Sequence, residues 1–184
     1  MRAILLDVPE TLLAERRRRG ADLFDEMWDG VLHMVLPPRA AHQYGAARLF
    51  VVLEPITTAL GLCSFFETGL FRAADDYRVP DQLYCRLESL SERGAEGAEL
   101  VVEIPSPGDE SYDKIDWYAA RGVRELLMVH PPDRRVELLR AVGDRLLPVT
   151  ADTDGAVRSD VLGVRFRTVG DRLELTWDGG SAQI

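Results

Sequence analysis

The chain has 184 residues, with 46% hydrophobic and 29% charged side chains, which is the size and balance of one soluble globular domain. This composition excludes wholesale disorder, which combines low hydrophobicity with high net charge. The net charge of −9 argues against non-specific nucleic-acid binding, which depends on neutralising phosphates. A nucleic-acid function would therefore need a local basic face or metal ions beside the carboxylates.

The first third of the chain predicts two helices with a hairpin between them. The predicted elements are a helix over 9–19 closed by Gly20, strands over 26–28 and 31–36, and a helix from Ala40 that Pro55 ends or kinks at Glu54, with Gly61 closing any continuation. Asp29-Gly30 is a tight-turn pair, and Pro37-Pro38 ends the second strand. The arginine run 16–19 resembles a DNA-binding patch, but cations are favoured in the last turn of a helix, and we prefer that interpretation.

The middle of the chain predicts short strands. Residues 62–68 and 70–73 are expected to form a strand pair around Gly69, and 78–86 a further strand. Residues 100–104 form a short, nearly continuous apolar run, the pattern of a fully buried central strand.

The segment after residue 104 predicts a crossover unit. Pro105 to Gly108 form a sharp exit loop, Ser111 caps a helix that ends before Gly122, and 126–130 is a second buried strand stopped by Pro131-Pro132. Strand, helix and strand joined by short loops predict neighbouring parallel strands. Beyond them, 136–140, 145–149, 164–168 and 173–176 predict antiparallel strands at the sheet edge or over one face. We therefore expect a mixed α/β domain over residues 1–184.

Two acidic residues, Asp81 and Glu103, lie within predicted strands, where an acidic side chain is unexpected. Glu103 interrupts the buried strand, and an isolated ionised carboxylate cannot be buried without a cation, a metal or a neutralising pKa shift. It could equally lie near the strand end and pair with an arginine. Asp81 lies in a predicted strand, where aspartate has poor propensity.

The chain contains one lysine, Lys114, beside 21 arginines. Lysine is a compact point charge whose pKa shifts readily on burial, whereas a guanidinium is planar and stays protonated. Lys114 follows the Glu103 strand on the next helix, so its flexible stem can return to the strand end. Two carboxylates, an ammonium and Mg²⁺ or Mn²⁺ can hydrolyse phosphodiesters, although the spacing alone is weakly specific.

Several of these motifs together carry a resemblance to a known family. The segments 26–30 (EMWDG), 78–81 (RVPD), 100–107 (LVVEIPSP) and 112–125, with His42 at the start of the long helix, resemble the Uma-two family of restriction endonucleases. This family is also called domain of unknown function 820 and belongs to the PD-(D/E)XK nuclease superfamily. The resemblance covers about residues 20–170, and the order of the motifs is specific.

The resemblance implies a restriction-endonuclease-like fold, a mixed sheet flanked by helices, with a metal-dependent phosphodiesterase site. Asp81 is then the aspartate of the Pro-Asp motif and Glu103 the second acid. The superfamily pattern places a lysine two residues after that acid, where this chain has Pro105. In Uma-two proteins the lysine lies on the next helix, here Lys114, and Glu26 matches the family's early glutamate, an additional metal or water ligand.

On this basis we expect a Mg²⁺- or Mn²⁺-dependent DNA endonuclease. Asp81 and Glu103, with the Ile104 carbonyl and Glu26, would hold the metal, and the metal and Lys114 would activate a water for in-line attack. His42 is a candidate substrate contact, although a helix-start histidine satisfied by hydrogen bonds is an equal alternative. A homodimer is expected by analogy, since cutting both strands takes two sites.

Other sites are less well supported by the pattern. His33, His42 and His130 lie on different predicted elements without the close spacing of zinc ligands. Trp28, Trp117 and Trp177 are expected in the core or an interface. The match also has two departures, Pro105 after the Glu103-Ile104 pair and His130 in place of the family's usual acid.

Two rival functions remain open. The first is a catalytically inactive nuclease-fold module that binds nucleic acid or a protein partner, which the acidic residues 1–130 favour. The second is a structural partner protein, which would leave the buried carboxylates unexplained. No transmembrane run or signal peptide is apparent, and Cys63 and Cys85 lack disulfide or metal spacing, so we expect a cytoplasmic protein.

Overall fold

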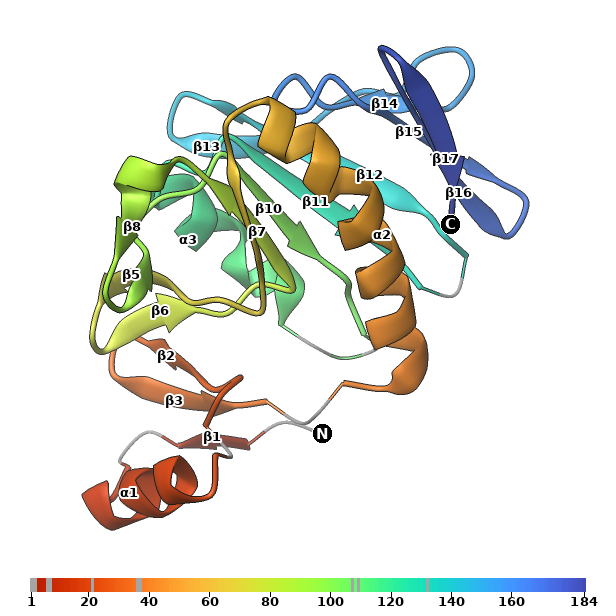
Figure 1. The fold of residues 1–184 in the computed structure, drawn as a ribbon. Coiled ribbons are helices and arrows are strands. Elements are labelled where there is room, and N and C mark those ends of the chain that lie inside the picture. The colour runs from red at the N-terminus through yellow and green to blue at the C-terminus, as the bar shows by residue number, and fades with distance from the viewer. Residues whose placement is uncertain are drawn as a thin grey trace.

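The computed structural model describes residues 3–5, 8–20, 22–35, 38–106, 108, 110–131 and 133–184. Within these ranges the chain folds into three β-sheets with helices packed against them, so the predicted mixed α/β class is confirmed (Figure 1). Leu36, Pro37, Pro107 and Pro132, to which breaks or strand ends were assigned, lie outside the described residues. Among the described helices, none combines the length and hydropathy needed to cross a membrane.

The central sheet has six strands and contains the predicted crossover. Its order is β13 (Arg145–Pro148), β12 (Val136–Val142), β11 (Glu125–Val129), β10 (Leu100–Glu103), β7 (Gln82–Cys85) and β4 (Cys63–Phe66). The pair β10–β11 is parallel and the other pairs are antiparallel. The crossover between β10 and β11 consists of the 3₁₀ helix η2 (Ser111–Lys114) and α3 (Ile115–Ala120).

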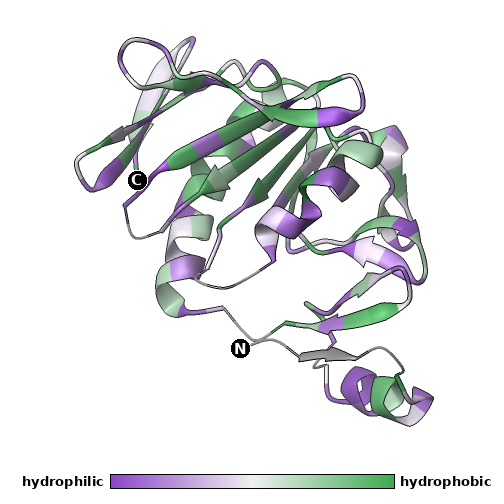
Figure 2. Ribbon diagram, turned by 180° about the vertical axis from the view of Figure 1, so that it is seen from behind, coloured by the Kyte–Doolittle hydropathy of each residue, from purple (hydrophilic) through white to green (hydrophobic). Residues whose placement is uncertain are grey.

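Both faces of this sheet are covered. Leu100 and Val102 pack in one cluster with residues of α2 (Ala40–Ala59), whereas Val101 packs in the other with Tyr118 of α3. Successive side chains of a strand point to opposite faces, so Glu103 belongs to the α3 face. Figure 2 shows the central strands coloured hydrophobic along most of their length, as expected for a sheet buried on both sides.

The other two sheets flank the central one. The first has the order β1 (Ala3–Leu5), β3 (Val31–Met34), β2 (Glu26–Trp28), β6 (Asp76–Arg78), β5 (Leu70–Ala73), β9 (Gly94–Ala95) and β8 (Leu90–Ser91). The second, formed by the C-terminal residues, consists of β14 (Val157–Arg158), β15 (Arg165–Val169), β16 (Arg172–Trp177) and β17 (Gly180–Gln183). It shares the α2 face of the central sheet, because Phe166, Leu173 and Leu175 join the α2 cluster.

The N-terminal predictions are confirmed in outline. Helix α1 (Glu10–Arg18) ends before Gly20, and β2 and β3 form the expected hairpin, in which Asp29 and Gly30 both have positive φ, the geometry favoured in two-residue hairpin turns. The arginines of α1 are paired with acids, for example Arg16 with Asp25 at 2.6 Å. They therefore do not form a free basic patch.

Two strand predictions were wrong. The segments around Gly69 do not pair with each other, since β4 joins the central sheet beside β7 and β5 joins the flanking sheet beside β6 and β9. The predicted strand over 78–86 is two strands, β6 and β7, with Asp81 in the break between them. Pro80 lacks the N–H that would continue the ladder, and the chain passes from one sheet to another here.

One helix end agrees with the second of two predicted alternatives, and one helix start differs from the prediction. Helix α2 does not end at Glu54 but continues through Pro55 to Ala59, and Gly61, which was expected to close any continuation, follows with a positive φ. Pro55 and Val51 are both exposed, so the carbonyl four residues before the proline, which loses its helical donor, lies on the solvent side. Ser111 is the first residue of η2 rather than its cap, and that position belongs to Glu110. A second 3₁₀ helix, η1 (Leu87–Ser89), follows β7.

Candidate active site

The predicted site residues come together where β10 ends, from four segments of the chain. Glu103 ends β10, Lys114 ends η2, Glu26 begins β2, and Asp81 lies between β6 and β7. Glu103 faces α3 because of the strand alternation described above. The flanking sheet contributes Glu26 and the β6–β7 break contributes Asp81, so the site lies at the junction of two sheets.

Lys114 lies between two glutamates. Its Nζ is 2.8 Å from Oε1 of Glu26 and 3.1 Å from Oε1 of Glu103. All three side chains are at most one tenth exposed. Coulombic attraction from the two glutamates outweighs desolvation and raises the pKa of Lys114 above its ordinary value. The amine is therefore held in its charged form.

Glu26 accepts three hydrogen bonds or ion-pair contacts. Besides Lys114, its Oε1 accepts the backbone N–H of Val79 at 2.9 Å, and its Oε2 accepts the indole N–H of Trp28 at 2.8 Å. Glu26 and Trp28 are two residues apart on β2, so their side chains lie on the same face of the strand. Glu26 is thus fixed by β2 and by the start of the β6–β7 break.

Glu103 is a buried carboxylate beside other acids. Burial raises the pKa of Glu103 to about 7, an effect that Lys114 opposes and that Asp81 and Glu26 reinforce. The hydroxyl of Tyr118 donates to Oε1 of Glu103 at 2.5 Å. Three carboxylates and one ammonium therefore share this position, and negative charge is in excess when Glu103 is ionised.

Asp81 is fixed against the residue that follows Glu103. Its Oδ2 accepts the backbone N–H of Ile104 at 2.6 Å. Its Oδ1 lies 3.3 Å from Nε2 of His42, near the start of α2, and the interaction with Asp81 raises the pKa of His42 against the effect of burial. The other ring nitrogen of His42, Nδ1, is buried and has no hydrogen-bond partner among the described residues.

The remaining histidines do not contact the carboxylates of this cluster directly, although His33 lies opposite Glu26 in the β2–β3 hairpin. Nδ1 of His33 is 2.8 Å from Glu110, and its ring stacks on Trp28. Nε2 of His130 is 2.8 Å from Glu137. The three histidines thus contact three different acids.

Sequence reasoning missed the groups that hold the site together. Tyr118 is four residues after Lys114, a spacing that places side chains on one helical face and could have indicated a shared contact. The guanidinium of Arg78 lies between two indole rings, 4.3 Å from the centre of Trp28 and 4.4 Å from that of Trp117, a cation–π arrangement. This Trp28–Arg78–Trp117 sandwich supports the indole that donates to Glu26.

A divalent cation fits the donor set at the end of β10. Carboxylate oxygens, here those of Asp81 and Glu103, are the ligands that Mg²⁺ and Mn²⁺ prefer, and a cation would offset the excess negative charge. In the described part of the chain, no group of three or more His, Cys, Asp or Glu side chains has an arrangement suited to a metal. Mg²⁺ is usually held by only one or two carboxylates and several waters, which this site can provide.

Comparison with known proteins identifies what the chain is similar to. The model of the Uma2 family, described as "Putative restriction endonuclease", matches residues 10–170. A solved structure, a "putative nuclease belonging to DUF820" from Anabaena variabilis, superposes with a TM-score of 0.60 at 16% identity, over 75% of this chain and 82% of that chain. No curated protein matches the chain. The superposition confirms the predicted nuclease fold.

Proposed function

The chain belongs to the Uma2 family, and on that premise we propose that it is a metal-dependent endonuclease that hydrolyses phosphodiester bonds of DNA. The observation that carries the proposal is the buried cluster in which the chain's only lysine contacts Glu26 and Glu103, with Asp81 bonded to the next peptide. Buried carboxylates that outnumber their positive partners need a cation. A cation at this position would also offset the negative charge of a phosphodiester substrate.

Asp81 and Glu103 would hold the cation, with the carbonyl of Ile104 as a further oxygen ligand. When bound, Mg²⁺ or Mn²⁺ polarises a phosphoryl oxygen and lowers the pKa of a coordinated water. The N–H of Ile104 fixes Asp81 at 2.6 Å, and Tyr118 fixes Glu103 at 2.5 Å. Both carboxylates are therefore positioned in advance, which limits the reorganisation needed during the reaction.

Lys114 would act as a fixed positive charge. Because the two glutamates raise its pKa, its amine stabilises negative charge on the phosphate and orients a water by donating a hydrogen bond, and it does not accept a proton. Glu26 receives contacts from Lys114, Val79 and Trp28. These favour a role in positioning Lys114 over the predicted role as a metal ligand.

We assign His42 to positioning Asp81 rather than to the predicted contact with the substrate. Its Nε2 lies 3.3 Å from Asp81, and its Nδ1 is buried without a partner among the described residues, so this nitrogen would reach a phosphate oxygen only after a local rearrangement. Cutting both strands of a duplex takes two such sites, and we therefore expect a homodimer.

Mn²⁺ binding measured by calorimetry tests the metal site without a guess about the substrate sequence. We expect binding to the wild-type protein that Asp81→Ala abolishes. Cleavage of a supercoiled plasmid with Mn²⁺ or Mg²⁺ then tests the reaction, with Lys114→Gln as the inactive variant. Glutamine can still form a hydrogen bond to one of the two glutamates, so this variant removes the charge with the smallest change in packing.

Two results would contradict the proposal. Binding of Mn²⁺ that Asp81→Ala leaves unchanged would place the metal elsewhere. No Mn²⁺ binding, with or without an added oligonucleotide, would instead favour the catalytically inactive module, in which Lys114 and its two glutamates form a structural ion cluster.

A further inference from the structure

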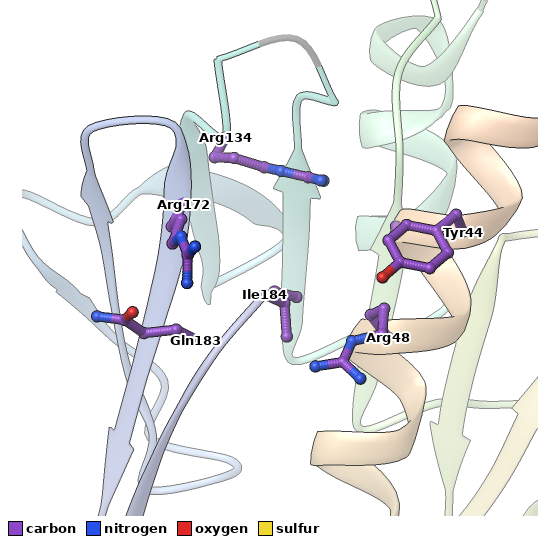
Figure 3. A pocket seen from close by; sticks show the side chains of 7 residues that line it. Tyr44, Arg48, Arg134, Arg172, Gln183 and Ile184 are labelled. Atoms are coloured by element: carbon purple, nitrogen blue, oxygen red, sulfur yellow. The ribbon is translucent and has the colours of Figure 1, made fainter.

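A pocket of about 220 Å³ lies between α2 and the C-terminal sheet, and arginine side chains line it. Tyr44, Gly45 and Arg48 line it from α2, and Arg134, Arg172 and Gln183 line it from the opposite side. Figure 3 shows Tyr44 and Arg48 projecting from the helix toward Arg134 and Arg172.

The three guanidinium groups of this pocket lack acidic partners. Most described arginines elsewhere pair with carboxylates, as Arg167 does with Glu174 at 2.7 Å, although a few exposed ones, among them Arg145 and Arg158, have no ion pair within the described ranges. Across the described ranges, no ion pair involves Arg48, Arg134 or Arg172. Three like charges lining one pocket repel one another, and a bound anion would relieve this repulsion. The pocket is thus a locally positive region of a protein whose net charge is −9.

The backbone around Arg134 holds its side chain in the pocket. Arg134 has a φ of 55°, in the left-handed region that is uncommon for side chains other than glycine. Its N–H donates to the carbonyl of His130 at 2.9 Å, and its own carbonyl accepts from the hydroxyl of Thr168 at 2.7 Å. The backbone of Arg134 itself is therefore held on both sides.

Gly45 makes room for this arginine. A Cβ added at Gly45 would lie 3.0 Å from Nη1 of Arg134, closer than ordinary contacts. Glycine inside a helix is less favourable than alanine by about 1 kcal/mol. At this position it allows a guanidinium to lie against the helix backbone, so the pocket is shaped by both partners.

The pocket lies close to the candidate active site along the chain. Helix α2 reaches Asp81 through His42, and Arg48 is six residues further on, a rise of about 9 Å along the helix axis. Six residues also turn the helix by about 600°, so the two side chains project about 120° apart around its axis. The pocket therefore lies further along the same helix as His42, on the side of the C-terminal sheet.

We infer that this arginine pocket binds a backbone phosphate of the nucleic-acid substrate, away from the bond that is cut. The inference rests on the proposed nuclease function. A guanidinium presents a planar fork that matches the oxygens of a phosphate. The pocket would supply the local positive charge that an acidic protein needs to retain DNA near its carboxylates.

Binding of a fluorescently labelled 20-base-pair duplex, measured by anisotropy at several salt concentrations in the presence of Ca²⁺, tests the inference. The pocket variant is Arg48→Ala with Arg172→Ala, both at exposed positions. The control is Arg145→Ala with Arg158→Ala, which removes two exposed arginines outside the pocket. Gly45→Ala, which forces the guanidinium of Arg134 to shift by a few tenths of an ångström without changing the charge, is a third variant.

We expect the pocket variant to raise the dissociation constant at least tenfold and to lower the salt slope by about 0.9, the value for one lost phosphate contact. The control should stay within twofold of wild type, and Gly45→Ala should weaken binding. The inference is overturned if the pocket variant binds the duplex like the control, or if wild type does not bind the duplex. It is also overturned if inorganic phosphate at micromolar concentration displaces the duplex from wild type. Arginine-dependent binding in Ca²⁺, together with no plasmid cleavage in Mg²⁺ or Mn²⁺, would instead overturn the proposed function and leave the pocket assignment in place.

Discussion

Two buried glutamates on neighbouring parallel strands have opposite surroundings. Glu125 begins β11 and lies beside Leu100, whereas Glu103 ends β10 and lies beside Met128. Glu125 accepts from donors only: Nε of Arg140 at 2.8 Å, the backbone N–H of Asp160 at 2.9 Å and the hydroxyl of Ser159. It ties the loop after β14 to the central sheet.

Glu103 lies among acids and a single lysine instead. Asp81 and Glu26 both raise its pKa, and Lys114 opposes them. The difference teaches that burial of a carboxylate does not identify a functional site by itself. A carboxylate saturated by protein donors stabilises the fold, whereas a surplus of carboxylates leaves a requirement for a cation.

The largest expected effect separates the two glutamates by activity. Glu103→Gln should lower the rate of plasmid cleavage by about a thousandfold, because it removes a charge from a preorganised site. Its free energy of unfolding should change little, since glutamine keeps the contact with Tyr118. Glu125→Gln should leave cleavage by the folded protein within a few-fold of wild type. Equal loss of cleavage in both variants would show that Glu125 matters as much for activity as Glu103, contrary to the roles assigned to them.

The second effect separates them by stability. Glu125→Ala should lower the free energy of unfolding by about 3 kcal/mol, because it leaves buried donors and a charged partner unsatisfied. Urea denaturation measures this difference. Glu174→Ala, which breaks the half-exposed pair with Arg167, is the matched control and should cost less than about 1 kcal/mol. Similar losses of unfolding free energy in the two variants would show that the contacts of Glu125 stabilise the fold no more than an exposed ion pair does.

The third effect concerns metal addition. Mn²⁺ at a hundred times its dissociation constant should stabilise the folded protein by about 2.7 kcal/mol, seen as a rise in Tm. Glu125→Gln should keep this rise, whereas Asp81→Asn should lose it. A rise that persists in Asp81→Asn would move the cation away from the end of β10.

The smallest effect extends the comparison to Asp76, a second carboxylate surrounded by donors. Burial disfavours its ionisation, but hydrogen bonds from Trp117 and Arg78 outweigh this and lower the pKa of Asp76 below its ordinary value of 3.8. Its stabilising contribution is therefore present above that value and is lost as the pH falls through the lower folded-state pKa. Asp76→Asn should cost about 1–2 kcal/mol at pH 7.

The pH dependence provides the check on Asp76. Urea denaturation of wild type and Asp76→Asn from pH 7 to pH 2 should show a stability difference that shrinks below about pH 4. A difference that stays constant over this range would mean that the charge of Asp76 contributes nothing.

Local patterns predicted the centre of the fold well. The apolar run ending in Glu103 and the short loops around Lys114 predicted a parallel crossover, because a buried strand and its return leave few alternatives. The same reasoning placed Glu103 near Lys114, and the distance of 3.1 Å agrees with it. The catalytic roles of these residues stay predictions.

Non-local pairings could not be predicted in the same way. The strands on either side of Gly69 look like a hairpin from their spacing, yet each finds its partner in a different sheet. The arginine pocket joins α2, the loop before β12 and the C-terminal sheet, and no spacing in the sequence connects them. Glu125 falls within a recognised motif, but two of its donors, Ser159 and Asp160, come from residues more than thirty positions later.

The Trp28–Arg78–Trp117 sandwich also makes the site observable by light. Two of the three tryptophans of the chain have a guanidinium within 4.4 Å of the ring centre, and the indole of Trp28 donates to the glutamate that holds Lys114. Indole emission responds to nearby charge, so a rearrangement at the site would change the intrinsic fluorescence. The protein thus contains its own optical reporter, and titrations or rapid-mixing experiments need no added dye.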